Sequence, residues 1–126
     1  MKHTFLTLVT IALAVACGEK KQPQPFSVIP MPNDVTLAEG SFNVAGTAVT
    51  CDENLDEASA KAVRGFVNTL ETVTGKACKK DKHGSIHFGL NPNLGAEEYF
   101  LQVKPDGVKV EASAFGGFFY AIQTLK

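Results

Sequence analysis

Pairs of adjacent carboxylates are the feature of this sequence best suited to acid–base chemistry, because two neighbouring acids can share the roles of proton donor and proton acceptor. The chain contains three such pairs: Asp52-Glu53, Asp56-Glu57 and Glu97-Glu98. The first two lie at or just inside the N-terminus of a predicted helix, where carboxylates complement the helix dipole. The third opens a predicted strand, whose successive side chains point to opposite faces and cannot converge on one bond. We therefore predict structural roles for these acids and no catalytic residue.

The histidines are the next candidates, as metal ligands. His83 and His87 are four residues apart, a spacing that on a helix would suit one shared ion. Gly84 and the alternating apolar pattern that follows it indicate an extended segment instead, in which four residues span ~13 Å. We interpret His83 as a loop residue and His87 as a solvent-facing side chain. The sequence predicts no metal site and no cofactor.

The cysteines at positions 51 and 78 are the third candidate pair. Neither a Cys-x-x-Cys motif nor a Cys/His spacing supports a metal site. A disulfide between Cys51 and Cys78 would need their Cα atoms within about 7 Å of each other. The sequence leaves a disulfide and two partly buried free thiols both open.

The first residues read as an export signal. Lys2 provides a positive charge, residues 5–16 form an apolar and small-residue run, and Cys17 follows directly. That run is shorter than the ~20 residues of a membrane-spanning helix, so we assign residues 1–16 to a signal peptide. The segment Leu13–Cys17 resembles a bacterial lipoprotein cleavage site, although Ala14 stands where Leu is commonest. The resemblance implies lipidation of Cys17 and a membrane-anchored protein of the periplasm or cell surface; secretion without lipid is the alternative.

Residues 17–25 are predicted to be a tether, because the run from Gly18 to Pro25 contains no apolar residue that could face a core. The remainder, 26–126, has the composition of one globular domain. The whole chain of 126 residues carries 12 Lys and Arg against 13 Asp and Glu, which argues against nucleic acid as a partner. It is also too short for a (β/α)₈ barrel, which needs roughly 250 residues.

Alternation of apolar and polar residues predicts a series of short strands. They fall at 35–37, 42–44, 48–51, 85–90, 99–103 and 108–112. The last two are expected to pair as a hairpin, because Pro105 and Gly107 between them have the backbone preferences of a tight turn.

Two helices are predicted from apolar residues at three- and four-residue steps. The first runs from Leu55 to Thr74, with Asn54 as its N-cap, Glu57 as the partner in a capping box and Gly75 as a left-handed C-cap. The second is expected to begin at Gly117, after a break at Gly116-Gly117. Its pattern is still running at Lys126 without a C-cap, so we expect this chain to be a piece of a longer protein.

Aromatic residues gather at this second helix. A row of exposed rings could stack on sugars, but the helical spacing favours packing within the core or against another domain. The candidate interdomain packing residues are Phe118, Phe119, Tyr120, Ile122 and Leu125.

Several of these segments, taken in order, resemble the N-terminal accessory domain of family 20 glycoside hydrolases, the β-N-acetylhexosaminidases. The resemblance covers residues 26–126. It is carried by Val28-Ile29-Pro30-Met31-Pro32, Gly84-Ser85-Ile86-His87-Phe88, Gly95-Ala96-Glu97-Glu98-Tyr99, Pro105-Asp106-Gly107-Val108 and Gly117-Phe118-Phe119-Tyr120-Ala121-Ile122-Gln123-Thr124-Leu125. It implies an α+β fold with a mainly antiparallel or mixed four-stranded sheet and helices packed on it.

The resemblance also implies that a catalytic (β/α)₈ barrel follows in the same chain. The family's barrel carries a His-x-Gly-Gly-Asp-Glu motif, which does not occur in these 126 residues. We therefore expect a non-catalytic domain of an exported enzyme that removes terminal N-acetylhexosamine from glycans. The alternatives are the accessory domain of another glycoside hydrolase, such as a family 84 enzyme or an α-glucuronidase, and a stand-alone surface lipoprotein that binds glycan or protein.

Overall fold

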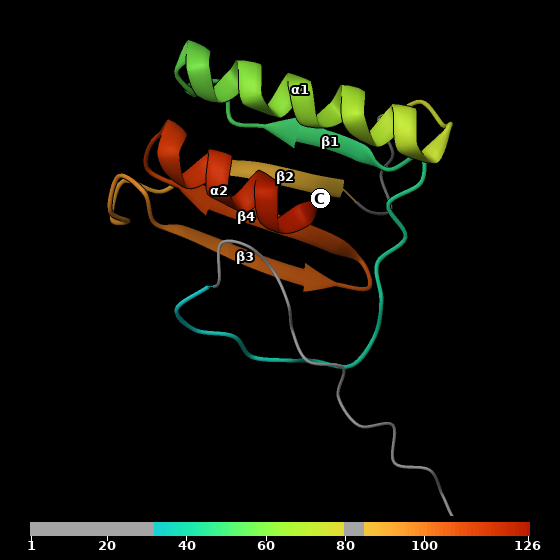
Figure 1. The fold of residues 1–126 in the computed structure, drawn as a ribbon, viewed down its shortest axis with the longest axis horizontal. Helices are drawn as coiled ribbons and strands as arrows, with labels where there is room; N and C mark the ends of the chain where they lie inside the picture. The colour runs from blue at the N-terminus through green and yellow to red at the C-terminus, as the bar shows by residue number, and fades with distance from the viewer. Residues whose placement is uncertain (1–31, 80–84) are drawn as a thin grey trace, which may run out of the picture.

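The computed structural model describes residues 32–79 and 85–126, in which two helices cover one face of a four-stranded sheet (Figure 1). The elements are β1 (Ala48–Cys51), α1 (Glu57–Thr74), β2 (Ser85–Leu90), β3 (Tyr99–Lys104), β4 (Gly107–Ala112) and α2 (Phe115–Leu125). The strands lie in the order β1-β2-β4-β3. The α+β fold with a mixed four-stranded sheet is therefore confirmed.

The sheet combines a crossover unit with a hairpin. β1 pairs with β2 in parallel, with α1 as the connection that parallel neighbours require. β2 also pairs in parallel with β4, and β4 pairs antiparallel with β3 across the predicted turn, where Lys104 faces Gly107. This pairing places Ile86 beside Val108 and Phe88 beside Val110 on one face.

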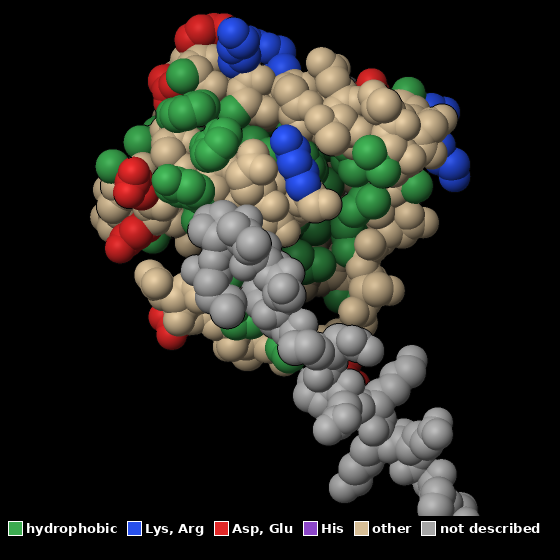
Figure 2. All heavy atoms as spheres, viewed as in Figure 1, with side chains coloured by type: hydrophobic (Ala, Val, Ile, Leu, Met, Phe, Trp, Pro, Cys, Tyr) green, Lys and Arg blue, Asp and Glu red, His purple; other side chains and the backbone are tan. Residues whose placement is uncertain are grey.

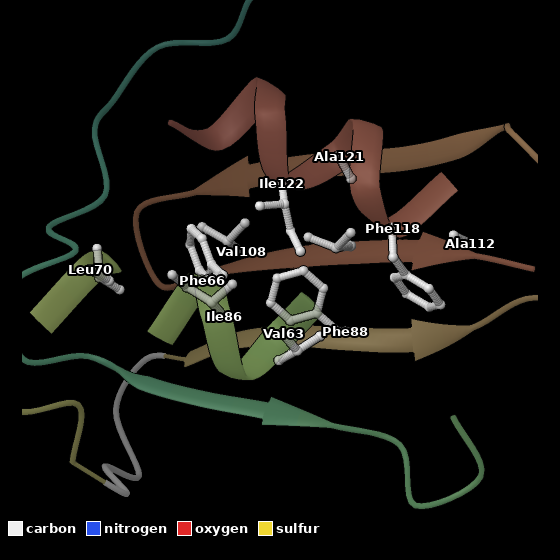
Figure 3. Packing of buried hydrophobic residues seen from close by; sticks show 11 residues of the cluster. Val63, Phe66, Leu70, Ile86, Phe88, Val108, Ala112, Phe118, Ala121 and Ile122 are labelled. Carbon is white, nitrogen blue, oxygen red and sulfur yellow. The ribbon is translucent and has the colours of Figure 1, made fainter. Parts of the chain in front are cut away.

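The core lies between that face and both helices (Figure 3). Phe88 is fully buried, and its ring lies 5.7 Å from that of Phe66 in α1 and 6.4 Å from that of Phe118 in α2, measured between ring centroids. One strand residue thus contacts both helices. The other buried members of the cluster are Val63, Leu70, Ile86, Val108, Val110, Ala112, Ala121 and Ile122.

Helix α1 begins two residues later than the sequence predicted. Its N-cap is Asp56, whose carboxylate accepts hydrogen bonds from the Ser59 backbone N–H at 2.9 Å and from the Ser59 hydroxyl at 2.6 Å. Asn54 was the wrong choice because the carboxylate two residues on makes both bonds and adds a negative charge at the helix N-terminus. The predicted C-cap is confirmed: Gly75 adopts a φ of 65°, and its N–H donates to the Glu71 carbonyl at 2.9 Å.

The predicted strands at 35–37 and 42–44 are absent, since residues 32–47 contain no strand. Alternation produces a strand only where a neighbouring strand takes up the backbone hydrogen bonds and one face is buried. Val35 and Leu37 are 44% and 61% exposed. Phe42, from the same segment, packs against the core. The other predicted strands are confirmed.

Helix α2 begins at Phe115, so Gly116 and Gly117 lie in its first turn and do not break the chain. Gly117 is buried, and a Cβ atom built on it would collide with the Glu98 carbonyl and the Ala112 side chain. Its N–H donates to the Ala96 carbonyl at 3.2 Å. The glycines therefore allow the helix to approach the sheet closely.

None of the helices in the described ranges is long and apolar enough to cross a membrane. The predicted signal peptide, tether and lipidation residue Cys17, and also His83, lie outside the described residues.

Candidate functional site

Of the three acid pairs, Asp56-Glu57 takes its predicted place at the N-terminus of α1, whereas Asp52-Glu53 precedes the helix and Glu97-Glu98 lies in the loop before β3 and does not open the strand. Asp56 caps α1, and its pKa lies below the ordinary value because it accepts hydrogen bonds from the Ser59 hydroxyl and backbone. Glu57, in the first turn of α1, pairs with Arg64 at 2.7 Å on the exposed side of the helix. Glu98 accepts the Gly95 N–H at 2.7 Å and so closes the loop before β3.

Asp52 belongs to a polar cluster on the sheet face opposite the helices. Its Oδ2 accepts the Leu90 N–H at 2.8 Å, and its Oδ1 lies 3.2 Å from Nε2 of His87. The other ring nitrogen of His87 lies 2.8 Å from the Thr50 hydroxyl. These contacts fasten β1 to β2 across their parallel pairing, in which Thr50 faces His87.

His87 is partly exposed, as predicted, but sequence reasoning missed its partners. Its side chain is 41% exposed. The contacts with Thr50 and Asp52 follow from the register of two strands that are separated by α1 along the chain. Apolar and polar residues alternate in both segments, which predicts two strands, but this pattern does not indicate which strands pair.

A second polar group lies on β4. The Glu111 carboxylate contacts the Lys109 ammonium at 2.6 Å and accepts a 3.3 Å hydrogen bond from the Asn91 side chain. The Lys109 contact, followed by the one with Asn91, holds the pKa of Glu111 below its ordinary value. The carboxylate is therefore charged and paired, which suits a structural group better than a proton donor.

The two cysteines are free thiols, so the disulfide that the sequence left open does not form. Cys51 is exposed and Cys78 is half-buried. Burial, together with the nearby Glu71 carboxylate, raises the pKa of the Cys78 thiol. Among the described residues, no group of three or more His, Cys, Asp or Glu side chains could hold a metal ion.

A shallow hollow of about 220 Å³ lies at the turn between β3 and β4. It is lined by polar side chains that include Gln102, Lys104, Asp106 and Lys109. Among the described residues that line it, Asp106 is the only acid, so these residues do not provide the two carboxylates that acid–base cleavage of a glycoside commonly uses.

The candidate interdomain packing residues divide between two environments. Phe118 and Ile122 are buried at 0% and 4% exposure in this domain's own core. Phe119 is 42% exposed, and Tyr120 and Leu125 are half-buried. Phe115, another member of this aromatic group, is exposed beside Phe119, with 5.8 Å between the ring centroids.

The described part of the chain thus combines polar groups engaged within the fold with a helix that exposes aromatic rings. Comparison with known proteins defines its class. Residues 26–126 match the model of glycosyl hydrolase family 20, domain 2. The chain therefore belongs to glycosyl hydrolase family 20, and the matched part corresponds to that domain.

Solved structures of family members have the same fold. An exo β-N-acetylglucosaminidase from Vibrio harveyi, in complex with N-acetylglucosamine, is 26% identical over 76% of this chain, with a TM-score of 0.62. A β-N-acetylhexosaminidase from Bacteroides fragilis is 26% identical over 79%, with a TM-score of 0.59. A chitobiase from Flavobacterium johnsoniae, 23% identical over 82% with a TM-score of 0.61, shares the fold.

This chain spans only 15% of the Vibrio protein, 20% of the Bacteroides protein and 18% of the Flavobacterium protein. A search of curated proteins found no match.

Proposed function

We propose that this chain is the non-catalytic N-terminal accessory domain of an exported β-N-acetylhexosaminidase. The intact enzyme hydrolyses terminal N-acetylhexosamine residues from glycans, using a (β/α)₈ barrel that follows in the same chain. The observation that carries this proposal is the family match over residues 26–126, together with the small share of each related enzyme that the chain spans.

The arrangement of the acids supports a non-catalytic role. Asp52, Asp56 and Glu98 each accept a backbone N–H, and Glu57 and Glu111 each pair with a cation. A general acid needs a raised pKa near the working pH, whereas Asp56 and Glu111 have lowered values. The hydrogen bonds and ion pairs of these acids suit residues that hold the ends of helices and strands in place.

The export signal supports the location. Residues 1–16 have the charge and apolar run of a signal peptide, and Cys17 has the position of a lipidated cysteine. We place the enzyme in the cell envelope, attached to a membrane through lipid on Cys17, where extracellular glycans are accessible.

The test is hydrolysis of p-nitrophenyl N-acetyl-β-glucosaminide by two proteins. The 126-residue chain should release no p-nitrophenol above a heat-killed control, and the product of the complete reading frame should release it. Turnover by the purified 126-residue chain would overturn the non-catalytic role. A complete reading frame that stops at Lys126, or that encodes a different hydrolase, would overturn the assignment to a β-N-acetylhexosaminidase.

A further inference from the structure

The sheet face opposite the helices carries a row of polar side chains that crosses all four strands. Its members, which face one another in register, are Thr50 of β1, His87 of β2, Lys109 of β4 and Gln102 of β3. Neighbouring strands lie about 4.8 Å apart, so the row is about 14 Å long. The molecular face that carries α2 differs, because hydrophobic side chains gather there (Figure 2). The polar row therefore offers hydrogen-bonding groups at regular steps along the open sheet face.

The hollow at the turn between β3 and β4 lies at the Gln102 end of this row. Its volume is about 220 Å³, and its exposed lining side chains include Gln102, Lys104, Asp106 and Lys109. Within the described ranges, no hydrogen bond or ion pair engages the side chains of Gln102, Lys104 or Asp106. An amide, an ammonium group and a carboxylate are thus available together, and they can both donate and accept hydrogen bonds.

The charges around the hollow balance one another. Lys104 and Lys109 are the cations, and the anions are Asp106 in the lining and Glu111, which contacts the Lys109 ammonium at 2.6 Å. A phosphate or another strongly charged ligand would therefore gain little long-range attraction here. A small concave surface with many donors and acceptors but no excess charge suits an uncharged polyhydroxyl ligand, such as a sugar.

Phe100 adds an aromatic ring to the same face. It precedes Gln102 by two residues on β3, so both side chains point to the open side of the sheet, about 7 Å apart along the strand. Phe100 is 43% exposed and faces Glu111 in the register with β4. An aromatic ring beside a few placed polar groups is a common composition of small-molecule sites, and it matches a sugar, which has apolar C–H faces and a polar edge.

We propose that the open sheet face is a glycan-binding surface. One sugar ring lies in the hollow beside Gln102 and Phe100, and the oligosaccharide continues along the polar row toward His87. The ligand is an uncharged glycan that contains N-acetylhexosamine, and this choice of sugar rests on the proposed function. The acetamido group of such a sugar has one donor and one acceptor, which the Gln102 amide complements. The domain thereby holds the enzyme on the polymer whose ends it hydrolyses.

Native gel electrophoresis through glycol chitin, a soluble and uncharged polymer of N-acetylglucosamine, tests the inference on the product of the complete reading frame. Glycol chitin should retard the wild type, and Phe100→Ser and Gln102→Ala should each weaken binding about tenfold, because each removes a direct contact. Val73→Ser and Asn68→Ala are the matched controls, since they remove an exposed apolar side chain and an exposed amide from α1. Both controls should bind like the wild type.

Hydrolysis of p-nitrophenyl N-acetyl-β-glucosaminide provides the second readout, and all four variants should retain the wild-type rate. The glycan-binding surface is overturned if glycol chitin does not retard the wild type, if all four variants are retarded equally, or if only a sulfated polymer such as heparin retards the protein. Any of these results together with hydrolysis leaves the proposed function standing. Retardation that depends on Phe100 and Gln102 in a protein without a hydrolase domain overturns the proposed function and keeps the glycan-binding surface.

Discussion

Asp56 is the residue whose chemistry the structure defines most closely. Its carboxylate takes up two donors from Ser59, and its negative charge lies at the positive end of the α1 dipole. Asn54, two residues earlier, lies outside the helix. These neighbouring positions therefore provide a test and its control within one loop.

We expect Asp56→Ala to lower the melting temperature of the 126-residue chain by a few degrees Celsius, because the first turn of α1 loses its cap. Asn54→Ala should change it much less. Thermal denaturation followed by circular dichroism measures both. Equal effects of the two substitutions would show that Asp56 is not the cap that matters.

The same residue predicts a pH dependence. The folded-state pKa of Asp56 lies below its ordinary value of 3.8, so its stabilisation is complete above that value and is lost as the pH falls through the folded pKa. Asp56→Asn keeps a good capping side chain without the titration. The stability difference between the wild type and Asp56→Asn should therefore shrink between about pH 5 and pH 2. A difference that stays constant over this range would contradict the assignment.

At the scale of elements, the contact between α2 and the sheet depends on a residue without a side chain. Gly117 faces the Glu98 carbonyl and the Ala112 methyl group, where a Cβ atom has no room. Gly65 in α1 offers the opposite situation, because a Cβ atom there meets nothing within 4 Å. The same substitution should therefore have opposite effects in the two helices.

We expect Gly117→Ala to destabilise the domain by about 1–3 kcal/mol, since the added methyl group forces α2 away from β3 and β4. Gly65→Ala should stabilise it by about 0.5–1 kcal/mol, because alanine is the better helix former at an open position. Urea denaturation of the 126-residue chain measures both. If Gly117→Ala is neutral, the close approach of α2 is not a constraint on the fold.

The whole molecule has two unlike faces. The helices cover one side of the sheet and leave the other polar, with Thr50, His87 and Lys109 aligned across β1, β2 and β4. Of the polar groups on that side, Thr50 is paired with His87 and Lys109 with Glu111, whereas the outer side of α2 exposes the aromatic rings of Phe115 and Phe119.

The proposed membrane attachment depends on a single residue outside the described part, Cys17. Cys17→Ala should move the protein from the membrane fraction to the soluble fraction, because stable attachment needs more than one acyl chain and these would all be lost. Immunoblotting of separated fractions measures the change, with Cys51→Ala as the control, since Cys51 is a free, exposed thiol of the folded domain. Retention of Cys17→Ala in the membrane fraction would rule out a lipid anchor at this position.

Much of the fold follows from local pattern. The α1 stripe and Gly75, the alternation at 85–90 and the Pro-Asp-Gly turn of the hairpin each depend on residues close together in the chain, and all four features are present. The family resemblance over residues 26–126 is likewise a property of residue order, and the family match confirms it. Sequence alone therefore determined the class of domain and most of its elements.

The tertiary structure decided the features that depend on distant partners. Whether Val35 and Leu37 form a strand depends on a neighbour that takes their hydrogen bonds, and whether Gly117 interrupts a helix depends on the space left by Glu98 and Ala112. The division of α2 into a buried side and a side that exposes Phe115 and Phe119 also depends on how the helix is turned against the sheet. Local periodicity specifies that a helix has an apolar side, but only packing against particular neighbours specifies which apolar residues remain uncovered.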